Sequence, residues 1–212
     1  VFAMTDKSKG TRGISAFIVE SSFPGFSVGK HEEKLGLHGS PTAEIVFTDC
    51  IVPKENLLGA EGKGFKIAMQ TLDGGRIGIA AQALGIAEGA MEESINFAKT
   101  REQFGRPIAK FQAIAFMIAE MATKLEAAKN LVYKTAWLID NGQDASMAAS
   151  MAKFYASEVC NEIAAKTVQI HGGYGFIKDY KIERMFRDCR VFTIYEGTSQ
   201  VQQMVISGKL LK

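Results

Sequence analysis

The stretch FQAIAFMIAEMATKLEAAKNLVYKTAWLID, residues 111–140, decides the fold class. Its apolar residues recur at steps of three and four, the period of one face of an α-helix, at Ile114, Met117, Ile118, Met121 and Leu125. Similar patterns predict long helices over residues 64–99 and 144–169, and shorter ones over 182–188 and 198–210. Three long helices and short companions indicate an up-down helical bundle.

Helix breakers fall between these segments, at Gly105-Arg106-Pro107, Asn141-Gly142 and Gly172-Gly173. Asp144 is expected to be the N-cap of the helix that follows it. Small residues also recur along the first long helix, at Gly78, Ala81, Gly85 and Gly89. Charged residues interrupt this stripe, so it indicates close helix packing or a subunit interface and not a membrane motif.

Before residue 59 the pattern is that of a β domain. Strands are expected over residues 14–19, 26–28 and 44–48, separated by glycine and proline turn signals. The fold class is therefore α+β, with a partial antiparallel β domain over residues 1–58 and a helical bundle domain over residues 59–212. Val1-Phe2-Ala3-Met4 is typical of a strand interior, so we expect the sequence to be the C-terminal part of a longer protein.

The composition excludes several classes of protein. A net charge of +2 without a basic run argues against a nucleic-acid-binding protein. No run of 18 or more apolar residues is present, so no membrane span is expected. Three cysteines, few and odd in number, indicate reduced thiols, and no spacing of cysteine and histidine suggests a metal site.

The segment Ile194-Tyr195-Glu196-Gly197-Thr198-Ser199-Gln200 places a carboxylate between an apolar pair and a glycine, where a helix should start. Apolar neighbours disfavour the charged form of an acid, which makes it a usable base near neutral pH. The alternative is a first-turn glutamate that complements the helix dipole.

Three other segments suggest ligand contacts. Arg101 to Pro107 sets two arginines and an aromatic around a glycine, which suits a phosphate and a ring, although an arginine at a helix C-terminus also fits the dipole. Gln169 to Gly175 is rich in glycine but follows a helix, so it is no Rossmann fingerprint, and Gly172 or Gly173 could simply cap that helix. Gly74 and Gly75 lie inside a helix at a cost of about 1 kcal/mol each, so we expect a ligand or another backbone to pass close to them.

In this order and spacing, these segments resemble the acyl-CoA dehydrogenase family over the whole chain, most closely its short-chain (butyryl-CoA) members. The motifs that carry the resemblance are Lys34-Leu35-Gly36-Leu37-His38-Gly39-Ser40, Gly64-Phe65 through Leu72-Asp73-Gly74-Gly75-Arg76, Arg101-Glu102-Gln103-Phe104-Gly105, and Gln169-Ile170-His171-Gly172-Gly173 leading to Tyr195-Glu196-Gly197-Thr198.

The resemblance implies a flavoenzyme that dehydrogenates a short-chain acyl-CoA to a trans-2-enoyl-CoA. Glu196 is implied as the base for the α-proton, and FAD as the acceptor of the β-hydride. Relatives of the isovaleryl type carry their base just before the arginine of the first long helix; that position is Gly75 here, which cannot act as a base. Electron-transferring flavoprotein is the implied electron acceptor, and the implied assembly is a homo-oligomer, a dimer of dimers.

The resemblance also implies the binding residues. The substrate contacts carry over to Asp73, Gly74, Gly75, Arg76 and Gly197. The FAD contacts carry over to Arg101, Phe104, Gln112, Gln169, Ile170, His171, Gly172, Gly173, Thr198, Ser199 and Gln200. In the family, the contacts from the arginine loop and the glycine segment reach the FAD of a neighbouring subunit.

Two departures from the family pattern stand out. His38 replaces a common arginine, and the N-terminal helical domain and first half of the β domain are not found in this sequence. Two rival functions stay open: a helical module that oligomerises without catalysis, and an acyl-CoA oxidase that passes electrons to oxygen. The expected location is the bacterial cytoplasm, or the mitochondrial matrix in a eukaryote.

Overall fold

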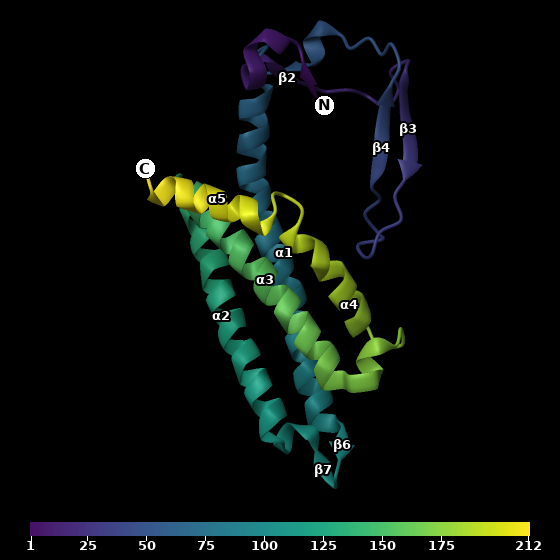
Figure 1. Ribbon diagram of the computed structural model, residues 1–212, viewed down its shortest axis with the longest axis vertical. Helices are drawn as coiled ribbons and strands as arrows, with labels where there is room; N and C mark the ends of the chain where they lie inside the picture. The colour runs from purple at the N-terminus through teal and green to yellow at the C-terminus, as the bar shows by residue number, and fades with distance from the viewer. The chain divides into compact units, whose positions relative to one another are not determined.

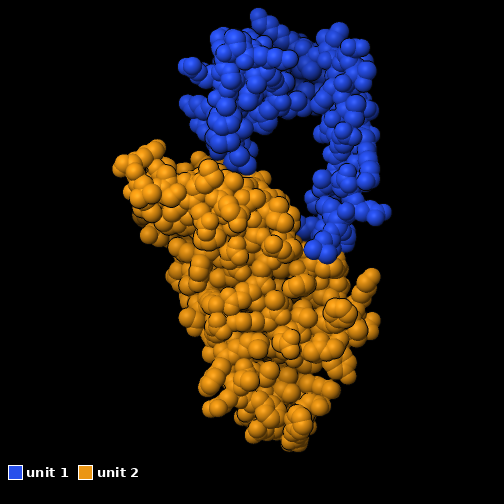
Figure 2. All heavy atoms as spheres, viewed as in Figure 1, with its two compact units in different colours: residues 1–72 blue, residues 73–212 orange.

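The computed structural model describes residues 1–212 as two compact units, Val1–Leu72 and Asp73–Lys212 (Figure 2). The division falls inside helix α1 (Gly64–Thr100), so this helix contributes to both units. The domain boundary that the sequence predicts between residues 58 and 59 stays a prediction.

The first unit is built from short antiparallel strands, as expected. A three-stranded sheet has the order β1-β2-β5, with Phe2 opposite Ala16 and Ala16 opposite Leu58. A second, two-stranded sheet pairs β3 with β4. The elements are β1 (Phe2–Met4), η1 (Lys7–Gly13), β2 (Ile14–Phe17), β3 (Phe26–His31), β4 (Ala43–Phe47), η2 (Lys54–Asn56) and β5 (Leu57–Leu58).

Few residues of the first unit are buried. Ala16 and Ser15 of β2 are buried, whereas Val28, Ile45 and Phe47 of the two-stranded sheet are exposed. Since apolar burial is the main stabilising contribution to folding, this unit gains little from its own contacts.

The second unit is a helical bundle (Figure 1). Its long helices are α1, α2 and α3, and the shorter α4 and α5 pack on α3. This confirms the expected three long helices and their companions. The elements after α1 are β6 (Glu102–Gln103), β7 (Arg106–Pro107), η3 (Ile108–Lys110), α2 (Gln112–Asp140), α3 (Ser146–His171), η4 (Gly172–Phe176), α4 (Ile182–Cys189), η5 (Arg190–Thr193) and α5 (Ser199–Leu210).

Helix α3 lies at the centre of the bundle, and small side chains let its neighbours approach. Ala152, Ala156 and Ala164 of α3 are buried, as are several alanines of α1. A buried hydrogen bond from Ser94 Oγ to Thr167 Oγ1, 2.9 Å long, joins α1 to α3. Small residues permit this close contact between backbones, so the alanine-rich faces explain how α1 and α3 pack.

The stripe of small residues on α1 is mostly uncovered within the chain. A side chain added at Gly89 would meet Met185 Cε at 3.3 Å, so this glycine packs against α4. At Gly78 and Gly85 an added Cβ would meet nothing within 4 Å. Of the two roles that the sequence left open for this stripe, internal packing therefore explains only Gly89.

The ends of α3 test two capping predictions. The N-cap is Ala145, so the prediction of Asp144 was wrong by one residue. The Asp144 carboxylate still accepts a hydrogen bond from Ser146 N at 3.0 Å, which satisfies a free amide of the first turn. At the other end Gly172 caps the helix with φ 59°, a left-handed conformation that favours glycine.

All three cysteines are free thiols. None of the helices combines the length and the hydrophobicity that crossing a bilayer requires.

Candidate active site and cofactor pocket

Glu196 sits in a tight loop between η5 and α5. Its φ is 53° and that of Gly197 is 87°, so two successive residues are left-handed. A left-handed conformation costs a residue with a side chain about 1–2 kcal/mol, and such strain gathers at functional sites. The N-cap of α5 is Thr198, so Glu196 lies before the helix, and its first turn holds no acidic residue. The alternative of a first-turn glutamate is therefore excluded.

The carboxylate of Glu196 reaches across to α1 and lies against the bare backbone of Gly75. A Cβ added at Gly75 would come within 2.5 Å of Glu196 Oε2 and 3.0 Å of its Cδ. Any side chain at this position would displace the carboxylate. The close protein neighbour of Gly75 is thus a carboxylate and not another backbone, whereas Gly74 faces open space. A ligand close to these glycines stays a prediction.

The neighbours of Glu196 in the sequence differ from the expected apolar pair. Ile194 is 52% exposed and does not shield the carboxylate, which corrects that expectation. Tyr195 is half-buried; its hydroxyl donates to Gln82 Oε1 of α1 at 2.8 Å, and its ring stacks on Phe192. Burial, together with the charge of Glu196, raises the pKa of Tyr195 to about 12. Tyr195 therefore anchors the loop to α1.

Arg76 is buried beside Gly75. Its guanidinium forms an ion pair with Asp73 at 2.6 Å and contacts Ser150 Oγ at 3.4 Å. The structure records two buried side-chain atoms without a hydrogen-bond partner, Arg76 Nε and Gln202 Oε1. Both belong to residues next to the Glu196 loop. Unpaired buried polar atoms are rare in folded proteins and need an explanation, which makes this region a candidate site.

Two residues that sequence reasoning missed hold the loop from inside. Lys153 of α3 and Gln202 of α5 are fully buried, and both donate hydrogen bonds to the carbonyl of Gly197. A signal was available for Lys153, because it lies at core spacing between Ala149 and Ala156 on an apolar helix face. We call the following set the glutamate cluster: Gly75, Arg76, Lys153, Glu196, Gly197 and Gln202.

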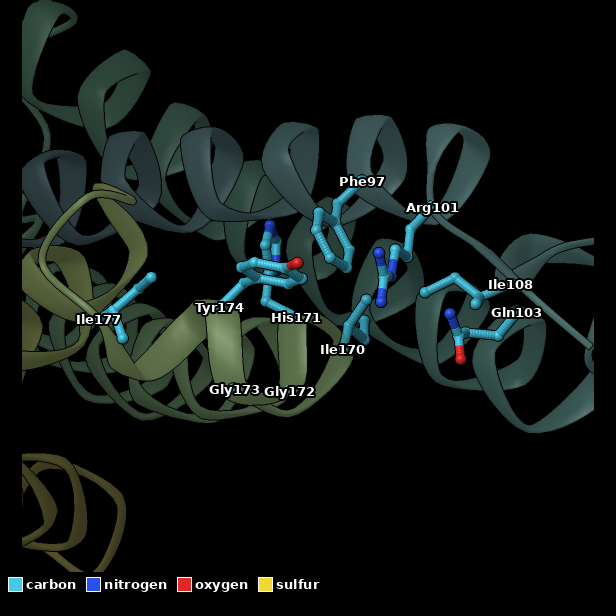
Figure 3. A pocket seen from close by; sticks show the side chains of 10 residues that line it. All are labelled: Phe97, Arg101, Gln103, Ile108, Ile170, His171, Gly172, Gly173, Tyr174 and Ile177. Atoms are coloured by element: carbon cyan, nitrogen blue, oxygen red, sulfur yellow. The ribbon is translucent and has the colours of Figure 1, made fainter.

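A second site lies at the far end of α1. A cavity of about 430 Å³ opens between the end of α1, the loop after it and the glycine segment after α3 (Figure 3). We call it the arginine pocket. Its lining residues are Phe97, Arg101, Gln103, Ile108, Ile170, His171, Gly172, Gly173, Tyr174 and Ile177.

Aromatic rings and one cation dominate the arginine pocket. The Arg101 guanidinium lies over the ring of Tyr174, 5.2 Å from its centroid, and Figure 3 shows this side chain extending from the end of α1 into the pocket. Phe97 stacks on His171 at 4.1 Å, and His171 Nδ1 bonds Thr167 O at 2.8 Å. Burial lowers the pKa of His171. The lining of the pocket therefore combines the Arg101 cation with the imidazole of His171.

The loop after α1 is a β-hairpin, β6–β7, with Phe104 and Gly105 at its turn. Both have positive φ, 53° and 78°, as a two-residue hairpin turn requires. Phe104 is 93% exposed, and a bulky residue rarely adopts this conformation. The turn therefore presents an aromatic side chain outward at the expense of local strain.

The remaining predicted site residues divide between the two regions. Four of the predicted cofactor residues line the arginine pocket with Arg101, namely Ile170, His171, Gly172 and Gly173. Exposed Gln112 and Gln169 lie outside its lining. The Ser199 hydroxyl is buried and donates to Glu158 at 2.6 Å, and the Thr198 hydroxyl accepts from Val201 N. Gln200 is exposed at the start of α5.

The two regions are far apart in one chain. Gly75 and Arg101 are 26 positions apart (101 − 75) along and just past α1. At a rise of about 1.5 Å per residue, this corresponds to about 39 Å. The glutamate cluster and the arginine pocket are therefore separate sites.

A profile described as "Acyl-CoA dehydrogenase, C-terminal domain" matches residues 62–211. The chain belongs to the acyl-CoA dehydrogenase family. It is 68% identical over 212 residues to caffeyl-CoA reductase-Etf complex subunit CarC of Acetobacterium woodii, covering 100% of this chain and 56% of that protein. It is 57% identical to a short-chain specific acyl-CoA dehydrogenase of Clostridium acetobutylicum, with the same coverage.

Among solved structures, butyryl-CoA dehydrogenase from Megasphaera elsdenii superposes with a TM-score of 0.98 at 55% identity, covering 100% of this acyl-CoA dehydrogenase chain and 55% of that one. The chain thus spans about half the length of the relatives it matches. The likeness confirms the expected family and fold class.

Acyl-CoA dehydrogenases use FAD, and the arginine pocket fits parts of this cofactor. Arg101 offers a cation for a phosphate, and Tyr174 offers a ring. An added Cβ at Gly172 or Gly173 would meet nothing within 4 Å, so the backbone there is open to a ligand. These features suit a molecule that carries both phosphates and aromatic rings.

Proposed function

We propose that this acyl-CoA dehydrogenase chain acts as the C-terminal half of a flavoenzyme that converts a short-chain acyl-CoA to a trans-2-enoyl-CoA. Glu196 is the base: its carboxylate takes the α-proton, and the electron pair of the broken C–H bond forms the new double bond as the β-hydride leaves. The FAD, when bound, accepts that hydride. The observation that carries the proposal is the Glu196 carboxylate set against the side-chain-free backbone of Gly75.

The contacts around Glu196 support this role. Three carboxylates lie in this region. Asp73 forms an ion pair with Arg76, and Glu158 accepts a hydrogen bond from Ser199. The carboxylate of Glu196 instead lies against the bare backbone of Gly75. A base must reach its substrate proton to within hydrogen-bond distance, so an unencumbered carboxylate beside open backbone suits the task. We assign Asp73, Gly74, Gly75, Arg76 and Gly197 to the substrate site.

We assign two groups of residues to FAD binding. In and around the arginine pocket these are Arg101, Phe104, Gln112, Gln169, Ile170, His171, Gly172 and Gly173. Beside Glu196, where the substrate reacts, they are Thr198, Ser199 and Gln200. The two sites lie about 39 Å apart along α1, and the family resemblance implies that the arginine loop and the glycine segment contact the FAD of a neighbouring subunit. Both points favour a homo-oligomer, a dimer of dimers, in which each flavin is held by two chains.

Anaerobic mixing of the full-length enzyme with butyryl-CoA tests the proposal. Loss of the oxidised flavin absorbance and formation of the 2-enoyl-CoA are expected, and the reduced enzyme should then pass its electrons to electron-transferring flavoprotein. Rapid reoxidation in air would indicate an oxidase instead. An absorbance scan of this chain alone for flavin separates a catalytic part from an assembly module.

A second candidate is the reverse reaction, reduction of a 2-enoyl-CoA. The 68% identity to a protein named as a subunit of a reductase–Etf complex favours it. The same site serves both directions, because protonated Glu196 would return the proton to the α-carbon. Comparing kcat/KM for butyryl-CoA oxidation and crotonyl-CoA reduction in one preparation decides which direction dominates.

A further inference from the structure

Two buried side chains from different helices fasten the loop that carries Glu196. Lys153 Nζ donates to the carbonyl of Gly197 at 2.6 Å. Gln202 Nε2 donates to the same carbonyl at 2.9 Å and to that of Glu196 at 3.1 Å. Both side chains are 0% exposed. Two adjacent peptide groups are thus held from the interior of the bundle.

These bonds act on the part of the backbone that is strained. Glu196 and Gly197 are both left-handed, and such conformations persist only when the surroundings impose them. In a trans peptide the N–H points away from the carbonyl. Fixing the carbonyls of Glu196 and Gly197 inward therefore also fixes the directions of the amides of Gly197 and Thr198.

Lys153 is an unusual choice for this position. Lysine is almost never fully buried without a charged partner, and here Nζ meets a neutral carbonyl. Its pKa is lowered to about 8, mainly by burial; Glu158 and Glu196 oppose this shift, whereas the positive charge of Arg76 contributes to it. An apolar side chain of similar length would avoid the desolvation of an ammonium group. Stability alone therefore does not explain a lysine here.

We propose that Lys153 and Gln202 are positioning residues that set the Glu196 carboxylate beside Gly75 by holding the Glu196–Gly197 carbonyls. The inference rests on the proposed role of Glu196 as the base. Neither residue is assigned a contact with substrate; each acts through the conformation of the loop.

The test uses Lys153→Met and Gln202→Met in the full-length enzyme. Met matches the length of the Gln side chain and is one atom shorter than Lys, and both replacements remove the donor. We expect kcat to fall about 10- to 100-fold, because a small misplacement of a catalytic group has an effect of this size. KM for butyryl-CoA should stay within about threefold, since ground-state binding is not altered. Amide exchange at Gly197 and Thr198 should become faster, which is measured without turnover.

Matched controls separate positioning from structure. Lys134→Met on α2 and Gln203→Met on α5 change the same residue types at exposed positions, and parental kcat is expected. Thermal unfolding of Lys153→Met should be unchanged or raised, since a desolvated charge is removed. A purely structural role predicts a lower melting temperature with parental kcat per folded enzyme, and that result would overturn the proposal. Should Lys153→Met not fold, Gln202→Met decides.

A double-variant comparison distinguishes this inference from the role of Glu196. If Glu196 is the base and the two residues act through it, adding Gln202→Met to Glu196→Gln should cause no further loss of rate. Full activity of Glu196→Gln alone would overturn the proposed function. An inactive Glu196→Gln combined with parental kcat and parental loop exchange in both Met variants would overturn only the positioning role.

Discussion

The glutamate cluster and the arginine pocket differ in how far the chain completes them by itself. Around Glu196, buried donors, a stacked tyrosine and a bare glycine already fix the loop. Around Arg101, a cation, two stacked rings and open glycine backbone line a cavity of about 430 Å³. A group that moves a proton gains from being held in advance, whereas a surface that binds a large ligand has to stay open.

The largest effect is expected from a substitution of Glu196, at the centre of the glutamate cluster. Glu196→Gln in the full-length enzyme should keep FAD bound and lower turnover of butyryl-CoA by about 10²–10⁴-fold or more, because the general base is lost. Steady-state rates and the flavin absorbance measure both properties. Dehydrogenation at more than a tenth of the parental rate would refute the assignment.

A second variant separates the activity of this cluster from its stability. Gly75→Ala should raise helix propensity by up to about 1 kcal/mol. Its Cβ would nevertheless crowd Glu196 Oε2, so the flexible carboxylate must move. We expect kcat to fall by about 10²-fold while thermal unfolding is unchanged or raised. Gly85→Ala on the same helix meets open space and is the control for propensity; equal rates for the two variants would contradict the contact.

In the arginine pocket a smaller effect is expected. Arg101→Ala should weaken FAD binding by about 1.5–3 kcal/mol, roughly 10- to 150-fold, since a charge-assisted contact to the pyrophosphate is removed. Titration of the apoenzyme with FAD measures it. Arg106→Ala is the matched control, because its guanidinium lies over Phe111 and outside the pocket lining. Equal affinities for parent and Arg101→Ala would mean that Arg101 is only a cation at a helix end.

The smallest expected effect concerns His171 in the same pocket. Burial lowers its folded-state pKa below the ordinary value of 6.5, so the unfolded chain binds the proton more readily. The contribution of neutral His171 to the free energy of unfolding is therefore complete above pH 6.5 and is lost as the pH falls through the folded-state pKa. Urea unfolding of this chain measures the free energy of unfolding between pH 7.5 and 5. As the pH is lowered, this free energy should decrease less for His171→Phe than for the parent. Parallel declines would argue against this linkage.

The local sequence pattern predicted much of the fold. The period of the apolar residues and the glycine breakers located all five helices to within a few residues, because each feature acts over one or two turns. The β6–β7 hairpin was not anticipated, since its turn needs positive φ at Phe104, which sequence favours only weakly.

Contacts distant in sequence were harder to predict. Arg101 and the glycine segment were linked only through resemblance to a family, and the structure does bring them together. The approach of Glu196 to Gly75 and the bonds from Lys153 and Gln202 join separate helices, and no periodicity reveals such partners. Shielding by Ile194 failed as an expectation because hydrophobicity alone does not fix which way a loop residue faces.

Helix α1 fixes both the distance and the relative rotation about the helix axis between Gly75 and the Arg101 loop. Inserting one residue between them would turn one end by about 100° relative to the other and shift it by about 1.5 Å. An insertion of seven residues would nearly restore the relative rotation of the two ends but lengthen the helix by about 10 Å. This stretch should therefore tolerate almost no change in length, even where its exposed positions accept substitutions.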